Sequence, residues 1–147
     1  MKKRVLILCT GNSCRSQMAE ALWRGMAGEQ WESFSAGSDP TGVVHPLAIR
    51  ALEEAGLDIA HARSKGVDDF VDMQIDLLIT VCDSARESCP VLPGVKESQH
   101  WPLFDPAQFT GDADAKLACF RRVRDEPRKK IESYLAQGRR RRGGKES

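Results

Sequence analysis

The sequence has no apolar run long enough to cross a membrane. Its 147 residues are 41% hydrophobic and 29% charged, which is ordinary for a globular protein. A membrane-spanning helix would need about 20 consecutive apolar residues. Residues 1–8 begin with basic side chains and continue with apolar ones, but the apolar part is too short for a secretory signal and no small-residue cleavage site follows. We therefore expect a cytoplasmic protein with no membrane partner.

A strong net charge is also missing. The formal net charge is +1, and residues 139–147 contribute +4, so the rest of the chain is mildly acidic at −3. Because clustered arginines and glycines at a chain end are typical of a solvated tail, we expect one domain over residues 1–138 and a disordered basic tail over residues 139–147. No repeat or linker divides the domain. We expect a monomer without a nucleic-acid partner.

The cysteines do not form the even set of a disulfide framework. An odd number of cysteines without a secretory signal suits reactive thiols in a reducing compartment, and the five are Cys9, Cys14, Cys82, Cys89 and Cys119. The three histidines are scattered, and the six residues between Cys82 and Cys89 fit the common structural zinc spacings poorly. We therefore expect no metal site.

Apolar runs and helical patterns alternate along the chain. Strands are expected at 4–8, 31–36, 76–81 and 99–101, helices at 15–27, 46–55 and 113–137, a helical turn at 67–71 and a loose helix at 83–88. This order predicts a single-domain, three-layer α/β sandwich, a four-stranded parallel sheet with helices on both faces. Pro127 falls inside the last helical pattern, so we expect a kink or a break there.

The most informative segment is Cys9–Ser16, which lies between the apolar run Val5–Leu8 and a helix. A short loop in this place turns its backbone N–H groups inward and binds a tetrahedral anion, helped by the positive end of the helix. The oxyanion-binding residues are then Thr10, Gly11, Asn12, Ser13, Cys14, Arg15 and Ser16.

Three side chains of this loop have chemical roles. The helix field and the arginine favour the thiolate of Cys9, which is the nucleophilic form. Arg15 offers a planar fork to two anion oxygens, and Ser16 can donate to the thiolate. Gly11 and Asn12 suit the positive-φ turns that the loop needs. The alternative is that Cys9 is only a buried cysteine at a strand end.

Three residues farther along the chain fit the same chemistry. Cys82 ends the third expected strand, where a neighbouring strand end can bring it near Cys9. The polar segment up to Cys89 could open locally, so oxidation could pass from Cys9 to Cys82 and then to Cys89. Otherwise Cys82 is a core residue and Cys89 an incidental surface one. Asp105, held by Pro106, could act as a general acid over the anion site, or it is only a turn residue.

Together these residues resemble the thioredoxin-coupled arsenate reductases, which have the low molecular weight tyrosine phosphatase fold. The resemblance spans about residues 4–136. It is carried by the segments 9–20 and 35–37, by Cys82, Cys89-Pro90, Trp101 and Asp105-Pro106, and by residues 120–126.

The resemblance implies a mechanism. Cys9 attacks arsenate, Arg15 and the loop amides stabilise the oxyanion, and Asp105 protonates the departing hydroxide. A Cys9–Cys82 disulfide forms as arsenite leaves, a Cys82–Cys89 disulfide replaces it, and thioredoxin reduces the latter. Phosphate or sulfate would bind as weak ligands, and weak phosphatase activity could remain.

The chain departs from this pattern near the loop. Some family members hold a monovalent cation there through a carboxylate, but residues 61–65 read His-Ala-Arg-Ser-Lys. We hypothesise that the ammonium of Lys65 takes the place of the cation, so that no tightly bound cofactor is needed. The loop would then be supported by Asn12, Ser16, Glu20, Ser35 and Lys65.

Two other functions remain open. The first is a low molecular weight protein tyrosine phosphatase. Such enzymes commonly carry tyrosines just after the Asp-Pro, whereas here Ala107 and Gln108 follow and the one tyrosine is Tyr134. The second is a non-catalytic regulator that binds an oxyanion or arsenite.

Overall fold

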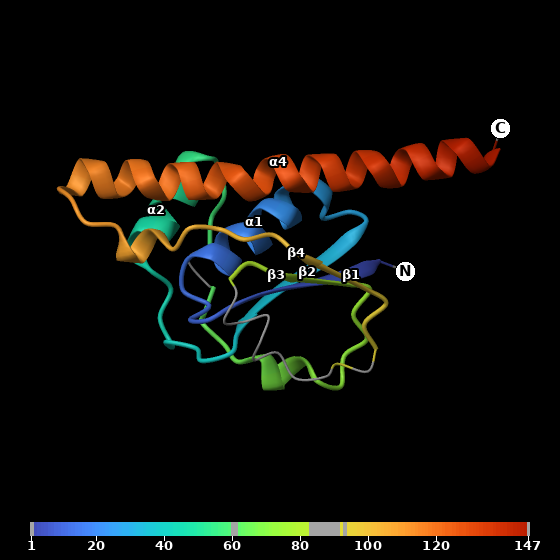
Figure 1. Cartoon of the computed structure of the whole chain (residues 1–147), viewed down its shortest axis with the longest axis horizontal. Coiled ribbons are helices and arrows are strands. Elements are labelled where there is room, and N and C mark those ends of the chain that lie inside the picture. The colour runs from blue at the N-terminus through green and yellow to red at the C-terminus, as the bar shows by residue number, and fades with distance from the viewer. Residues whose placement is uncertain (1, 60–61, 83–91, 93, 147) are drawn as a thin grey trace.

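Four parallel strands form the centre of the molecule (Figure 1). The computed structural model describes residues 2–59, 62–82, 92 and 94–146. The strands are β1 (Lys3–Cys9), β2 (Trp31–Gly37), β3 (Leu77–Thr80) and β4 (Glu97–His100), in the spatial order β2-β1-β3-β4. The predicted four-stranded parallel sheet is confirmed, with strand ends that differ by one or two residues from the expected ones.

The strand order of the sheet changes direction at β1. The connection after β1 leads to β2 on one side, and the chain then crosses to β3 on the other. The register pairs Cys9 with Gly37 and Leu8 with Thr80, so three strands end at the same edge. Such a switch point at the carboxyl ends of parallel strands is where α/β sheets bind ligands.

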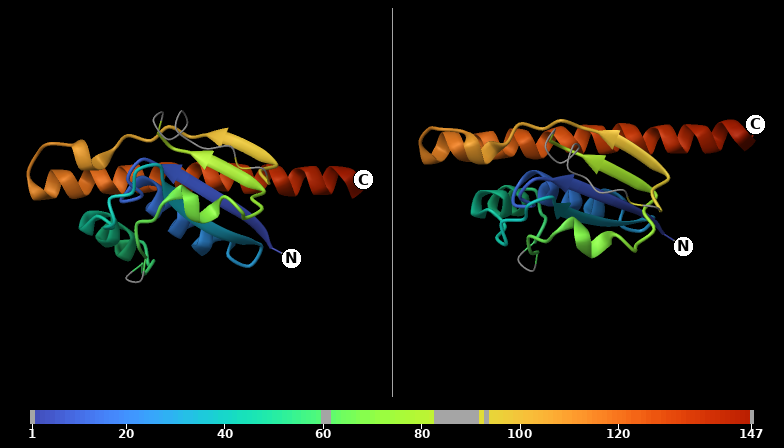
Figure 2. Two further views of the ribbon diagram at one scale, coloured as in Figure 1. Left: turned by 90° about the horizontal axis from the view of Figure 1, so that it is seen from below. Right: turned by 60° about the horizontal axis from the view of Figure 1, so that its bottom comes forward.

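The α-helices of the described chain pack on one face of the sheet (Figure 2). They are α1 (Arg15–Ala27), α2 (Pro46–Glu54) and α4 (Ala113–Glu146). Val5 and Ile7 of β1 belong to the apolar cluster that the α-helices form on this face. Leu6 and Leu8 belong to a second cluster on the other face, under the 3-10 helix η1 (Val67–Phe70). The sheet is thus covered on both faces, as expected; among the described residues, α-helices cover one face and η1 with its loops covers the other. The helix expected at 83–88 lies outside the described residues.

Helix α4 differs from its prediction. It runs through Pro127 without a break and continues to Glu146, beyond the end expected near residue 137 and into the segment 139–147 for which we predicted disorder. Proline removes one backbone hydrogen bond. The buried Phe120 and Val123 before it and the buried Ile131 after it fix both halves of the helix to the core.

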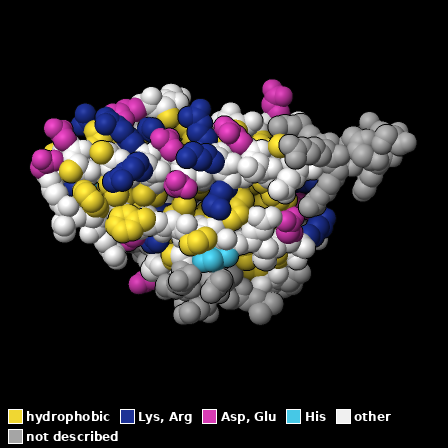
Figure 3. All heavy atoms as spheres, turned by 45° about the horizontal axis from the view of Figure 1, so that its top comes forward, with side chains coloured by type: hydrophobic (Ala, Val, Ile, Leu, Met, Phe, Trp, Pro, Cys, Tyr) yellow, Lys and Arg dark blue, Asp and Glu magenta, His cyan; other side chains and the backbone are white. Residues whose placement is uncertain are grey.

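The outer side of α4 carries charges of both signs. Figure 3 looks onto this side and shows Lys and Arg side chains interleaved with Asp and Glu side chains on the described part of the surface. None of the helices in the described ranges combines the length and the apolar character needed to span a bilayer.

Gly37 allows the end of β2 to approach the loop after β1. A Cβ atom at this position would lie 2.5 Å from the carbonyl oxygen of Thr10 and 3.0 Å from the nitrogen of Asn12. Both neighbours are backbone atoms of the loop, so they cannot move aside without changing its shape. Glycine is therefore required here by the close approach of two backbones.

We expect Gly37→Ala to destabilise the protein by about 1–3 kcal/mol, because the added methyl group forces the strand end and the loop apart. Thermal unfolding measures the effect. Gly138→Ala is the matched control, since a Cβ there meets nothing within 4 Å and the substitution removes glycine from a helix. It should stabilise by about 0.5–1 kcal/mol. Equal melting temperatures for Gly37→Ala and the wild type would contradict the close-packing argument.

Candidate active site

The loop of residues 10–14 connects the last residue of β1 to the first residue of α1. It lies at the carboxyl edge of the sheet, at the switch point described above. Cys14 is the capping residue of α1, and among the described residues no side chain caps this N-terminus. The free N–H groups of the first turn therefore remain available to an anion.

Cys9 is nearly buried, and two donors surround its sulfur. The Asn12 N–H donates to Cys9 Sγ at 3.1 Å, and Ser16 Oγ lies 2.8 Å from the same sulfur. Asn12 Nδ2 donates to Ser16 Oγ at 2.8 Å, which leaves the Ser16 hydroxyl proton free to point at Cys9. This arrangement suits a thiolate nucleophile, as expected from the sequence.

Asn12 fixes the shape of the loop. Its φ angle is +49°, and its side chain is fully buried. The Oδ1 atom accepts the backbone N–H of Lys65 at 2.9 Å, which settles the orientation of the amide. The Nδ2 atom then donates to Ser16 and, at 2.9 Å, to Ser35 Oγ. The expected supporting role of Asn12 thus has a direct structural basis.

The polar network continues from Ser35 to Lys65. The Ser35 hydroxyl donates to Glu20 Oε1 at 2.8 Å, and Lys65 Nζ lies 3.6 Å from the same oxygen. Lys65 Nζ also donates to the carbonyl of Arg63 at 3.3 Å. The structure therefore brings Lys65 to the place that we hypothesised, beside Asn12, Glu20 and Ser35.

Arg15 and Asp105 lie next to each other at the loop and form an ion pair. Arg15 NH2 lies 3.7 Å from Asp105 Oδ2, and Arg15 NH1 donates to the carbonyl of Leu103 at 3.4 Å. Asp105 also accepts the N–H of Ala107 at 3.1 Å and so caps the 3-10 helix η2 (Pro106–Gln108). Asp105 is therefore both a turn residue and a carboxyl group at the anion site.

Cys82 lies two residues beyond β3, next to the anion loop. Its sulfur is 3.2 Å from the hydroxyl oxygen of Thr10, and the residue is partly exposed. The neighbouring strand end does bring Cys82 to the Cys9 loop, as predicted. Cys89, the other member of the expected pair, lies outside the described residues.

The cavity above the loop has a volume of about 550 Å³. Its lining includes Cys9, Arg15 and Asp105 together, and the remaining residues are Thr10, Gly11, Ser13, Cys14, Asp39, Thr41, Val43, His45, Pro46 and Ala107. A nucleophile, a cation and a carboxyl group thus share one open space with the end of a helix. This is the machinery of an enzyme that attacks a tetrahedral oxyanion.

Comparison with known proteins agrees with this geometry. The sequence model for "Low molecular weight phosphotyrosine protein phosphatase" matches residues 4–142. The chain belongs to this family. Within it, the chain is 43% identical to an arsenate reductase of Halalkalibacterium halodurans over 93% of this chain and 98% of that one. It is 38% identical to an arsenate reductase of Bacillus subtilis over 92% and 97% of the two chains.

Solved structures of family members have the same fold. An arsenate reductase in a phosphate-binding state is 32% identical, with a TM-score of 0.71, and the match covers 92% of this chain and 98% of that one. A thioredoxin-dependent arsenate reductase of Corynebacterium glutamicum is also 32% identical, with a TM-score of 0.64, over 90% and 63% of the chains. The low molecular weight phosphatase of T. tengcongensis is similar in fold at 24% identity, with a TM-score of 0.74 over 92% and 99%.

The sequence did not identify three polar residues that contact the family's anion loop. Gln17 is buried and its Nε2 donates to Asn12 Oδ1 and to the Arg63 carbonyl, both at 2.9 Å. The Ser64 hydroxyl donates to the Gly11 carbonyl at 2.8 Å, and the backbone N–H of His45 donates to the Ser13 carbonyl at 3.0 Å. In the sequence, the one feature that could have indicated such a contact is the position of Gln17 at the start of the helix that follows the loop.

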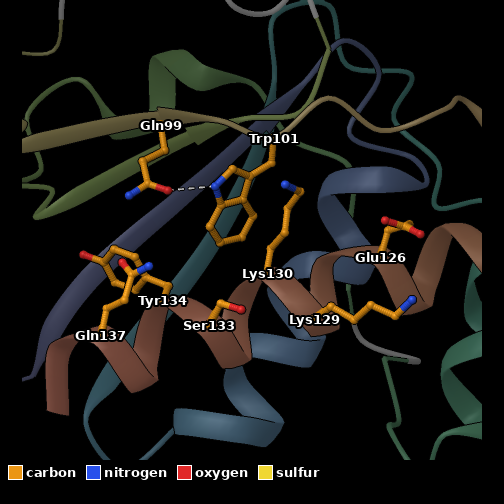
Figure 4. Close-up of a pocket in the computed structure, with 8 residues that line it drawn as sticks. All are labelled: Gln99, Trp101, Glu126, Lys129, Lys130, Ser133, Tyr134 and Gln137. Atoms are coloured by element: carbon orange, nitrogen blue, oxygen red, sulfur yellow. Dashed lines mark hydrogen bonds between the residues drawn. The ribbon is translucent and has the colours of Figure 1, made fainter. Parts of the chain in front are cut away.

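A second cavity lies between β4 and α4 and has a volume of about 390 Å³ (Figure 4). Figure 4 shows Trp101 directed toward α4 while its indole Nε1 donates to Gln99 Oε1, a bond of 2.8 Å. Lys129 and Lys130 belong to its wall, but the cavity shares no lining residue with the anion site. It therefore takes no part in the chemistry around Cys9.

Cys14 differs from Cys9 in its electrostatic environment. The pKa of the Cys14 thiol is raised to about 12, chiefly by burial; Asp105 and Cys9 contribute in the same direction, and Ser13 and Arg15 act in the opposite one. Cys14 therefore stays a neutral thiol at physiological pH. A neutral neighbour leaves the positive field of the loop to Cys9 and the bound anion.

We expect Cys14 to resist alkylation in the folded protein. With a pKa of about 12, roughly one Cys14 thiol in 10⁴ is ionised at about pH 8, and only the thiolate reacts with iodoacetamide. Mass mapping should show Cys9 and Cys82 modified well before Cys14, with Cys14 labelled normally after unfolding in denaturant. Labelling of Cys14 as fast as Cys82 in the folded protein would show that its thiol is not held neutral.

Proposed function

We propose that the protein reduces arsenate to arsenite, with Cys9 as the nucleophile and thioredoxin as the final electron donor. The observation that carries this proposal is the placement of a second thiol, Cys82, against the anion loop through Thr10. A phosphatase needs Cys9, Arg15 and Asp105, but it has no use for a second thiol there. The similarity to arsenate reductases over more than nine-tenths of the chain supports the same conclusion.

The first step is nucleophilic attack on arsenic. Arsenate occupies the loop, where the backbone N–H groups and the Arg15 guanidinium hold its oxygens. The Cys9 thiolate, held by Ser16 and the Asn12 N–H, forms a sulfur–arsenic bond. A hydroxide leaves arsenic and takes a proton from Asp105, which lies beside Arg15 in the cavity.

The second step transfers two electrons. The Cys82 thiolate attacks Cys9 Sγ, the sulfur–arsenic bond breaks, and its electron pair stays on arsenic, which is reduced from the +5 to the +3 state. Arsenite leaves, and a Cys9–Cys82 disulfide remains. Cys89 then attacks Cys82, which frees Cys9 and forms the Cys82–Cys89 disulfide that thioredoxin reduces. A cytoplasmic location suits this donor.

The same loop supports a second reaction. Phosphate fits an arsenate site, but thiols do not reduce phosphorus(V), so an aryl phosphate would be hydrolysed at Cys9 without Cys82 or Cys89. We therefore propose weak phosphatase activity beside the reductase. Pro106 begins η2 (Pro106–Gln108), so Ala107 and Gln108 follow the Asp-Pro where the phosphatases commonly carry tyrosines.

A coupled assay tests the relay. With arsenate, thioredoxin and thioredoxin reductase, we expect the wild type to sustain NADPH oxidation by thioredoxin reductase, and we expect the rate with Cys82→Ser or Cys89→Ser to fall to background. Both variants should still hydrolyse p-nitrophenyl phosphate, whereas Cys9→Ser should do neither. Cys119→Ser, which removes a buried thiol of α4, is the matched control and should keep both activities.

Two results would reject the reductase. The protein would be a phosphatase if the wild type did not reduce arsenate, and if the wild type and every variant except Cys9→Ser hydrolysed p-nitrophenyl phosphate equally well. If the Cys9→Ser variant had the same biological effect as the wild type, the protein would be a non-catalytic regulator.

We also propose that Lys65 takes the place of a monovalent cation behind the loop. The ammonium already lies 3.6 Å from Glu20 Oε1, and the Asn12 Oδ1 atom is occupied by two N–H donors. A potassium ion at this place would meet a positive charge and a carbonyl oxygen that is already bonded. The described side chains therefore do not fit a cation.

Replacing sodium by potassium at constant ionic strength should leave the melting temperature and the arsenate turnover of the wild type unchanged. Lys65→Met should lower the melting temperature, because Glu20 loses one of its two cationic partners, and should make stability respond to potassium. A strong potassium effect on the wild type would refute the role of Lys65.

A further inference from the structure

We propose that His45 is a further substrate-positioning residue, which offers an uncharged N–H donor to the oxyanion in the active-site cavity. This inference rests on the proposed function, because it assigns one more contact to the same anion. His45 comes immediately before α2 and has extended backbone angles, with φ −65° and ψ 133°. Its Nδ1 atom accepts the backbone N–H of Leu47 at 3.1 Å, so the side chain caps the helix.

The cap fixes the tautomer of the imidazole. A backbone N–H can only donate, so Nδ1 must carry no proton when it accepts from Leu47. Burial lowers the pKa of His45 below its ordinary value, and Lys116 adds to this effect while Asp105 opposes it. The ring is therefore neutral at physiological pH, and its one proton resides on Nε2.

Packing and backbone contacts hold the ring at the cavity. The His45 ring centroid lies 4.7 Å from that of the buried Phe120, and the His45 backbone N–H donates to the Ser13 carbonyl of the anion loop. The loop and the ring thus keep a constant relation to each other. A donor on a fixed ring loses little conformational freedom when a ligand binds.

His45 lines the same cavity as Cys9, Arg15 and Asp105. Within the described part of the chain, its Nε2 has no hydrogen-bond partner, and the contacts of His45 there involve Nδ1, the backbone and the ring face. Asp105 is close enough to influence the ring electrostatically. An oxyanion oxygen in the cavity can therefore accept a hydrogen bond from this N–H.

The chemistry of this donor differs from that of Arg15. The guanidinium attracts any anion through its charge, whereas a neutral N–H interacts with an oxygen only in the right direction. We expect His45 to fix the orientation of the oxyanion for attack by Cys9. It transfers no proton and no electron, so its role is positional.

Two substitutions separate the cap from the donor. Asparagine is a good helix cap but is too short to replace Nε2, so His45→Asn should keep the melting temperature. It should raise the KM for arsenate and the Kd for inorganic phosphate about ten-fold, with a smaller change in kcat. His45→Ala removes both functions and should in addition lower the melting temperature.

Nitrogen NMR of the imidazole gives a readout that does not depend on turnover. The spectrum of the phosphate-free wild type should show an unprotonated Nδ1 and a protonated Nε2, and inorganic phosphate should shift the Nε2 signal. His45→Asn with wild-type KM and phosphate affinity, or an Nε2 signal that phosphate leaves in place, would overturn the inference and leave His45 a helix cap. Phosphate binding that depends on His45 in a protein that does not reduce arsenate would instead sustain the inference and reject the proposed function.

Discussion

The left-handed backbone of Asn12 is the constraint on which the site depends. An L-residue in this conformation costs roughly 1–2 kcal/mol, and asparagine tolerates it better than most. The cost is offset because the Asn12 side chain bonds to α1, to β2 and to the segment before η1. The same turn directs the Asn12 N–H to Cys9 Sγ. The bond that activates the nucleophile and the bonds that hold the loop are thus properties of one residue.

Each strand of the sheet adds one part to the site at its carboxyl end. Cys9 ends the central strand β1, and Gly37 ends β2 where the loop passes closely. Cys82 follows β3 and contacts Thr10. Leu103 follows β4, and its carbonyl holds Arg15. Because parallel strands end at one edge, residues 9, 37, 82 and 103 meet without any long-range motif in the sequence.

The sequence was sufficient for the parts of the site that are local. Cys9, Arg15 and the strand–loop–helix order lie within one short segment, and Asp105 is marked by its proline. Gln17 and His45 were missed because a polar residue in the first turn of a helix, or before it, usually belongs to a solvated surface or a cap. Gln17 is buried and His45 is partly buried because of the way in which α1 and α2 meet the loop. At Pro127 a kink or a break was predicted, and a break does not occur for a similar reason, since core contacts on both sides outweigh one lost hydrogen bond.

The arrangement of charges explains why an acidic residue can support an anion site. Glu20 lies behind the loop, where an uncompensated carboxylate would oppose both the Cys9 thiolate and the bound oxyanion. Lys65 and Arg24 lie 3.6 and 3.3 Å from its oxygens and cancel this charge locally. Arg15 then remains the cation that lines the cavity, paired with Asp105, while Cys14 stays neutral. The loop can therefore concentrate its positive field on two successive anions, the thiolate and the substrate, because the polar network beneath it is electrically balanced.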